Sequence, residues 1–455
     1  MSLSLSGHAS GVARTARVSR EAVYRAVWRW HFYAGLLCLP FLVTLSATGA
    51  LYLFRPEINA TVFAHRTVVA PVAKPLGPDR LIFEAMQAVP GGTPVSYTGP
   101  ADPTGSAVVS LAEGPRRMLV YLDPADGTVL DVLDRDSEFF TVVKRLHSLA
   151  YFGPVANGAI EVVAGFAIIL VITGAYLWWP RGQEGGVVSV RGTPAKRVWW
   201  RDLHAVTGFV AGGGLLFLAL TGLPWSIVWG DQLRHWSNVA GLGQPTALWA
   251  NKPVSAVPMA QVLESTGWTM QDAPVPRSPS QGGNPLGIDE AAAVLDRMGV
   301  APGYELSLPV GPQGVYAAAV YPKDVARQRV VSLDQYTGKA LVDVPFQALG
   351  PVGRLVQYGI GIHLGQYLGR ANQIAMLAFC LGTILLSVTA GTMWWKRRPR
   401  GGIGVPPWPR DRRIVAGVTA LVLGLGILFP LTGLAILAML ALDLALGRAV
   451  MRRAA

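Results

Sequence analysis

The 455-residue sequence is poor in charge and in cysteine. Only 15% of its residues are charged, against about 25% in a typical soluble protein. Hydrophobic residues make up 51%, and the mean hydropathy is +0.38. This composition excludes a disordered chain, argues against a single soluble globule and favours a membrane protein that carries soluble parts. Cys38 and Cys380, the only two cysteines, both lie in apolar runs, which argues against a disulfide framework or a cysteine-based metal site.

Nucleotide-binding motifs are also missing. No G-x-G-x-x-G pattern follows a predicted strand, and the glycine run Ala211–Phe217 lies inside an apolar helix. There is no Walker motif either. The chain therefore has no NAD(P)H or flavin domain of its own, and any electrons that it carries must come from a quinol or a separate cytoplasmic reductase.

Long apolar runs, in contrast, are abundant. Four of them have the roughly 20 residues that a helix needs to cross a bilayer, and each predicts a transmembrane helix. A fifth run, Ile414–Leu446, has Pro430 near its middle and predicts either a hairpin of two short helices or one long kinked helix. The four predicted spans are Phe32–Phe54, Gly158–Trp179, Ala205–Trp229 and Ile374–Trp395.

The positions of the basic residues predict the orientation of these helices. The formal net charge is +12, and Lys and Arg are concentrated in the short loops 180–203 and 396–413. Short basic loops stay in the cytoplasm under the positive-inside rule. The long segments 55–146 and 231–362 are nearly neutral, so we expect them in the periplasm of a bacterial inner membrane. The positive charge is therefore a topology signal, and we expect no nucleic-acid partner.

The two halves of the chain repeat the same spacing of residues. His31 and His204 are each followed by Gly at +4 and by Thr-Gly at +17 and +18. His147 and His363 are each followed by Gly at +6, Thr at +26 and Trp-Trp at +31 and +32. Agreement at so many offsets indicates an internal duplication in which each half is a helix, an external domain and a second helix.

The external segments predict small α+β domains. Val120–Val132 and Val331–Val344 alternate apolar and polar residues around Gly127 and Gly338, which is typical of β-hairpins. A short amphipathic helix is predicted before each hairpin, so each segment should place a helix on an antiparallel sheet. The predicted segments are a cytoplasmic N-terminal tail (1–30), a helix (31–54), an external domain (55–146), a helix (147–179), a cytoplasmic loop (180–203), a helix (204–230), an external domain (231–362), a helix (363–395), a cytoplasmic loop (396–413) and a C-terminal helix or hairpin (414–447).

Four of the seven histidines occupy equivalent positions in the duplication. One histidine at a helix end can be an ordinary interfacial residue, but four in register favour a shared ligand. A membrane-embedded b-type haem needs one imidazole from each of two facing helices. A two-fold relation between the halves places His31 opposite His204 (the inner pair) and His147 opposite His363 (the outer pair). The sequence therefore predicts two bis-histidine haems b, one near each membrane face.

Other polar residues near these histidines are secondary candidates. Glu161 lies early in the second span, where an acid is costly, and is either a functional residue or an interfacial one. His8, His65 and His235 have no counterpart in the duplication and are weaker ligand candidates. Three arginines flank the predicted haem sites and either pair with haem propionates or serve only as orientation signals: Arg29, Arg201 and Arg145.

Taken together, these motifs resemble the PepSY-associated transmembrane family. The likeness covers roughly residues 25–440 and consists of paired L-H-x-x-x-G…T-G helices, Y-L-D-P-x-x-G-x-V-L-like hairpins and L-H-x-x-L…T-G-x-x-L-W-W-P-R helices. The family includes inner-membrane ferric-siderophore reductases. The resemblance implies a PepSY domain in each external segment, two haems b on transmembrane histidines and outward electron transfer to the iron of a ferric siderophore.

The fold class that we expect is a membrane α-helical bundle of four core helices plus a C-terminal helix or hairpin, with two external α+β domains. Two functions are open at this point. The first is a diheme ferric-siderophore reductase, and the second is a non-redox PepSY membrane sensor, regulator or transporter. Transporters also use duplications, but they usually break helices at the membrane midplane. Here the Gly and Pro breaks lie mostly at the ends of the spans.

Overall fold

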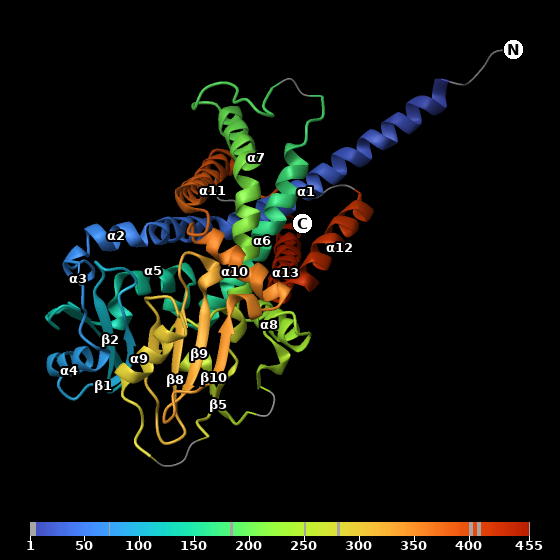
Figure 1. The fold of residues 1–455 in the computed structure, drawn as a ribbon. Coiled ribbons are helices and arrows are strands. Elements are labelled where there is room, and N and C mark those ends of the chain that lie inside the picture. The colour runs from blue at the N-terminus through green and yellow to red at the C-terminus, as the bar shows by residue number, and fades with distance from the viewer. Residues whose placement is uncertain are drawn as a thin grey trace. The chain divides into compact units, whose positions relative to one another are not determined.

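The computed structural model describes residues 6–454 apart from 72, 183–184, 250–251, 280–282, 400–403 and 407–410. The chain divides into two compact units, and each is described by itself (Figure 1). The helical unit comprises Met1–Ala50, Leu146–Asp231 and Ile374–Ala455, and the sheet unit comprises Leu51–Arg145 and Gln232–Gln373.

Among the described residues, four helices are long and apolar enough to cross a membrane, in agreement with the four predicted apolar runs. Helix α1 begins at Ser6, far ahead of the predicted span, because no proline interrupts the chain between Ser6 and the apolar run. The N-terminal segment 1–30 is therefore helical from Ser6 onward. The four helices are α1 (Ser6–Leu53), α6 (Pro154–Trp178), α7 (Arg197–Gly222) and α11 (Gly369–Arg397).

The fifth apolar run forms two helices, α12 (Arg412–Leu428) and α13 (Pro430–Ala454). The chain breaks at Pro430, whose ring cannot continue the helix before it. The backbones of Gly426 and Gly433 lie against each other, because neither residue has a side chain to hold the two helices apart. Of the two alternatives from the sequence, the structure therefore has the pair of short helices.

Helix α6 lies at the centre of the helical unit. Its buried side chains pack with those of α1, α12 and α13 in one cluster. Small residues bring the helices close together: Gly165 of α6 lies against Thr432 of α13, and Gly214 of α7 lies against the ring of Phe379 of α11. The buried members of the cluster are Trp30, Ala34, Cys38, Val163, Phe166, Ile169, Val422 and Ile436.

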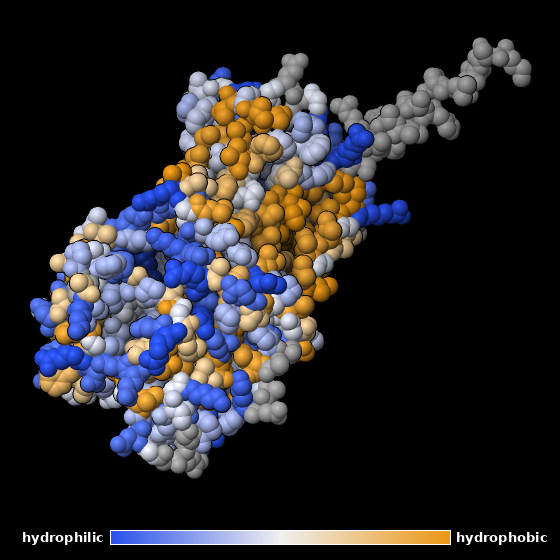
Figure 2. All heavy atoms as spheres, viewed as in Figure 1, coloured by the Kyte–Doolittle hydropathy of each residue, from blue (hydrophilic) through white to orange (hydrophobic). Residues whose placement is uncertain are grey.

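The outward faces of these helices are apolar. Four of their apolar side chains are between 65% and 83% exposed: Val210, Leu421, Ile427 and Leu434. Figure 2 shows hydrophobic side chains gathered over this unit. Soluble proteins rarely expose so much contiguous apolar surface. The chain is therefore a membrane protein whose helical unit faces lipid.

The sheet unit contains eight antiparallel strands in the order β10-β9-β8-β7-β1-β2-β3-β4. The predicted hairpins are present as β3–β4 and β9–β10, whose turns contain Gly127 and Gly338 with φ of 81° and 68°. Such positive φ angles favour glycine. The strands are β1 (Thr93–Thr98), β2 (Ala107–Glu113), β3 (Arg116–Leu122), β4 (Val129–Asp134), β7 (Glu305–Ser307), β8 (Val315–Val320), β9 (Arg329–Asp334) and β10 (Ala340–Pro345), beside a separate small pair, β5 (Val254–Pro258) and β6 (Pro274–Pro276).

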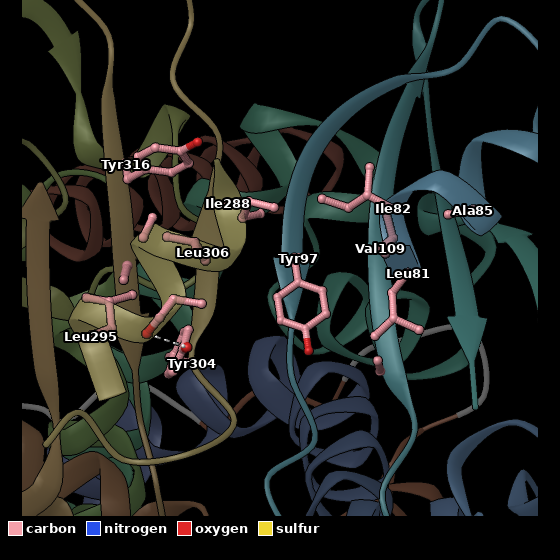
Figure 3. Close-up of a cluster of buried hydrophobic side chains, with 14 of the residues drawn as sticks. Leu81, Ile82, Ala85, Tyr97, Val109, Ile288, Leu295, Tyr304, Leu306 and Tyr316 are labelled. Atoms are coloured by element: carbon pink, nitrogen blue, oxygen red, sulfur yellow. Dashed lines mark hydrogen bonds between the residues drawn. The ribbon is translucent and has the colours of Figure 1, made fainter. Parts of the chain in front are cut away.

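One sheet joins the strands of the two predicted external domains. Strand β1 pairs with β7, with Tyr97 opposite Leu306. This pairing covers two strand edges that separate domains would leave open. Helices α4 (Pro78–Ala88) and α9 (Ile288–Arg297), the two predicted short helices, contribute to one shared hydrophobic cluster (Figure 3). The duplication itself stays an interpretation of the sequence.

The remaining helices are short. Helices α5 and α10 each end on one of the repeated histidines, His147 and His363, shortly before a long apolar helix begins. Their bounds, with those of the other short helices, are α2 (Arg55–Thr61), α3 (Ala64–Thr67), α5 (Phe139–His147), α8 (Trp229–Val239) and α10 (Pro351–His363).

Candidate functional site: histidine–threonine pairs in the helical unit

The structure brings the two histidines of the inner pair together. His31 projects from α1 and His204 from α7, and both rings are half-buried. Their ring centres lie 6.4 Å apart, and the ring planes are nearly perpendicular, at 84°. Two polar rings thus face each other between helices that are otherwise apolar.

The hydrogen-bond network fixes the tautomer of His31. Its Nδ1 lies 2.9 Å from the Oγ1 of Thr173 on α6. The hydroxyl of Thr173 donates its one hydrogen to the carbonyl of Ile169, at 2.6 Å. Oγ1 must therefore accept from Nδ1–H, which leaves the lone pair of His31 on Nε2.

The same arrangement recurs at His204. Its Nδ1 lies 2.9 Å from Thr389 Oγ1 and 3.2 Å from the carbonyl oxygen of Leu386. A carbonyl oxygen only accepts, so Nδ1 carries the hydrogen here too. Thr389 in turn donates to the carbonyl of Leu385, at 2.8 Å. Both rings of the inner pair consequently present Nε2 as the nitrogen able to bind a metal.

His147, of the outer pair, has a third copy of this contact. Its Nδ1 lies 3.0 Å from Thr48 Oγ1, and Thr48 donates to the carbonyl of Thr44 at 2.6 Å. His363 belongs to the sheet unit. The pairing of His147 with His363 therefore stays a prediction.

Glycines next to the threonines make room for two of the rings. A Cβ added at Gly174 would lie 3.3 Å from Cε1 of His31, and one added at Gly49 would lie 3.3 Å from Cε1 of His147. Such distances are tighter than ordinary van der Waals contact. Glycine at these two positions therefore lets the imidazole lie directly against the neighbouring helix backbone.

The inner pair fits a bis-histidine metal. With metal–nitrogen bonds of about 2 Å and ring centres about 1.1 Å beyond each nitrogen, two imidazoles on one metal have centres about 6 Å apart. The 6.4 Å separation agrees with this value. No group of three or more His, Cys, Asp or Glu side chains is gathered anywhere in the described part of the chain. A metal between His31 and His204 would therefore bring its other ligands with it, as haem iron does.

The three arginines predicted to bind propionates already have partners on the protein. The role of these side chains toward a haem stays a prediction, and Arg145 belongs to the sheet unit. The contacts are Arg29 with the hydroxyl of Tyr33 (3.0 Å) and the carbonyl of Pro406, Arg201 with Asp202 (2.9 Å), and Arg145 with Asp136 (3.1 Å).

Two of the weaker histidine candidates, His65 and His235, belong to the sheet unit. His65 is exposed and lies 3.8 Å from the carboxylate of Asp131 in the sheet unit. His235 is exposed on α8 beside Trp236, and the side chain of His8 lies outside the described residues. In the contacts of the described residues, neither His65 nor His235 is joined to a threonine.

The sequence interpretation missed the role of the threonines as ring partners. The signal was present, because Thr recurs 17 residues after His31 and His204 and 26 residues after His147 and His363. By themselves, these offsets indicate only the repeat. Each ring takes its threonine from a different helix, so spacing along one helix could not reveal the contact.

Glu161 on α6 has a structural role at the start of α8. Its side chain is fully buried, and its Oε2 accepts hydrogen bonds from the backbone N–H groups of Val228 (3.1 Å) and Trp229 (2.9 Å). These two donors lie where α8 begins and have no carbonyl of a preceding helical turn. The carboxylate thus satisfies the first N–H groups of α8, where a negative charge is also favourable.

Removal of this acceptor should destabilise the fold. Glu161→Ala should lower the free energy of unfolding by about 1–3 kcal/mol, because it leaves buried N–H groups without a partner. Glu161→Gln keeps one acceptor oxygen and should lose less. Thermal unfolding in detergent measures this, with the exposed Glu21→Ala as the control. Equal stability of the Ala variant and the wild type would contradict the capping role.

Comparison with known proteins places this architecture in a family. The model of the PepSY-associated TM region matches residues 28–397, which is more than half of the chain. A search of the curated proteins found no match. The match contains α1 from residue 28 onward, the whole of α6, α7 and α11, both candidate histidine pairs and the eight-stranded sheet. The chain therefore belongs to the PepSY-associated transmembrane family.

Proposed function

We propose that this protein carries electrons across a bacterial inner membrane on two b-type haems. The observation that carries the proposal is the inner pair, in which His31 and His204 face each other at 6.4 Å with Nε2 as the lone-pair nitrogen of each ring. An apolar helix bundle has little other use for two facing imidazoles held in one tautomer. Haem bound by these residues would supply a one-electron redox centre in a low-dielectric interior.

The outer pair, His147 and His363, is the second part of the proposal. It rests on the repeated spacing around the four histidines and on the Thr48–His147 contact, which repeats the contacts of the inner pair. We also propose that the two halves arose by duplication and that each half contributes a PepSY domain to the joined sheet. In this proposal the basic loops lie in the cytoplasm and the sheet unit lies in the periplasm.

The proposed reaction is the reduction of a ferric siderophore. The chain has no nucleotide-binding motif, so the proposed donor is a quinol or a separate cytoplasmic reductase. One electron converts Fe(III) to Fe(II) in the chelate. Siderophores bind the hard ferric ion far better than the softer ferrous ion, so reduction releases the iron.

Each histidine pair should lose its haem independently of the other pair. Replacement of His31 or His204 by Ala should remove the haem of the inner pair and leave the other absorption spectrum largely intact. The same change at His147 or His363 should remove the haem of the outer pair. Reduced-minus-oxidised spectra of the purified variants measure this, with the exposed His235→Ala as the control. If His31→Ala and His147→Ala abolished the same spectral component, the assignment of the pairs would be wrong.

The reduced protein should give electrons to ferric chelates. Dithionite-reduced protein, freed of excess reductant and kept anaerobic, should be reoxidised by a ferric siderophore, and ferrous iron should appear in a ferrozine trap. His363→Ala should block this transfer even where the inner haem remains reducible. The gallium(III) form of the same siderophore, which cannot be reduced, is the matched control.

Two outcomes of this experiment would contradict the assignment. Protein that stays reduced with a broad panel of ferric chelates would contradict siderophore reduction while leaving a diheme electron carrier in place. Protein that contains no haem at all would favour the alternative of a non-redox PepSY sensor, regulator or transporter.

A further inference from the structure

Three threonines hold three of the repeated histidines in the same way. We propose that Thr173, Thr389 and Thr48 are positioning residues for metal ligands: each fixes the Nδ1–H tautomer of one histidine and directs its Nε2 toward the iron. This inference rests on the proposed function. It goes beyond the proposed function by assigning a role to three threonines that would act through the histidines they contact.

The first argument is the direction of the hydrogen bonds. The hydroxyl of each of these threonines donates to a backbone carbonyl four residues earlier, at 2.6–2.8 Å. A hydroxyl has one hydrogen, so toward the imidazole it can only accept. In all three contacts, Oγ1 lies 2.9–3.0 Å from Nδ1 and not from Nε2. Every ring is thereby held in the tautomer that leaves Nε2 for a metal.

The second argument is the backbone behind Thr389. The carbonyl three residues before Thr389, that of Leu386, lies 3.2 Å from Nδ1 of His204. Nδ1 of His204 thus faces two acceptors on one helical turn, the carbonyl of Leu386 and the hydroxyl of Thr389. Two acceptors restrict the rotation of the ring more than one does.

The third argument is that the hydrogen bond from a threonine to the carbonyl four residues earlier does not by itself explain the arrangement. Thr392 on α11 and Thr44 on α1 also donate to the carbonyl four residues earlier, at 2.8 and 3.1 Å, but both bonds are exposed and neither hydroxyl contacts an imidazole. Apolar helices therefore accommodate threonine with or without a histidine partner. Thr392 lies three residues from Thr389 on the same helix and provides a matched control.

The expected chemical effect follows from ligand basicity. A ring that donates from Nδ1 to a strong acceptor becomes a better electron donor at Nε2. A better donor stabilises ferric over ferrous iron. Loss of the threonine hydroxyl should therefore raise the reduction potential of the haem on that histidine and weaken its retention. Outer-shell partners of this kind typically change metal affinity about 10–100-fold.

The test compares Thr389→Val, Thr389→Ser and Thr392→Val in the full-length protein. Valine keeps the branched shape of threonine and removes the acceptor, whereas serine keeps the acceptor. We measure the midpoint potential of the spectral component that His204→Ala removes, by anaerobic redox titration. Thr389→Val should shift the ferric/ferrous equilibrium up to tenfold toward ferrous iron, which is up to about 59 mV for one electron. Thr389→Ser should restore the wild-type value, and Thr392→Val should not change it.

Other outcomes separate this inference from the proposed function. If Thr389→Val has the potential and haem content of Thr392→Val, the positioning role is wrong while the haem assignment remains. If the wild type binds no haem, the proposed function fails, and the metal-directed role fails with it. The ¹⁵N NMR signal of His204 Nδ1 in the haem-free protein then shows whether Thr389 accepts its hydrogen bond, because the carbonyl of Leu386 keeps the same tautomer in the variant. An Nδ1 signal that is unchanged in Thr389→Val would contradict the contact as well.

Discussion

An imidazole in an apolar helix bundle must satisfy its polar nitrogens inside the protein, and this constraint organises the helical unit. Burial of a polar group without a hydrogen bond costs on the order of several kcal/mol of free energy. His31, His204 and His147 each meet the constraint at Nδ1, through a threonine on a neighbouring helix. The second nitrogen of each ring, Nε2, then offers its lone pair to a partner that can accept it. The arrangement thus restricts both the orientation of the ring and the chemistry that it can support.

The packing of the helices brings the histidines and threonines into contact. Thr173 lies on α6, the helix whose buried side chains hold α1, α12 and α13 together. Gly174 and Gly49 let the rings of His31 and His147 lie against helix backbones, where a Cβ would crowd them. Glu161, on the same helix as Thr173, accepts hydrogen bonds from the start of α8. Helix α6 therefore carries both the threonine that contacts His31 and the carboxylate that caps the start of α8.

Much of this architecture could be predicted because it depends on length and local pattern. The length of the apolar runs predicted four long helices, and turns ending in Gly127 and Gly338 predicted two hairpins. The repeat predicted that His31 faces His204, which are adjacent in the structure. The joined sheet could not be predicted, because the pairing of β1 with β7 uses backbone groups that every strand edge offers. The threonine contacts and the cap at Glu161 were missed for a similar reason, since each depends on how helices pack across the bundle.

The account depends on whether the facing histidines hold haem, and one measurement tests this most directly. The haem b content of the purified protein, determined as the pyridine haemochromogen and divided by the protein concentration, should be close to two per chain. Electron paramagnetic resonance of the oxidised sample should show low-spin ferric iron, as binding by two imidazoles would produce. A content near one would leave a single pair as a haem site. A content near zero would contradict the assignment of both pairs and with it the redox function.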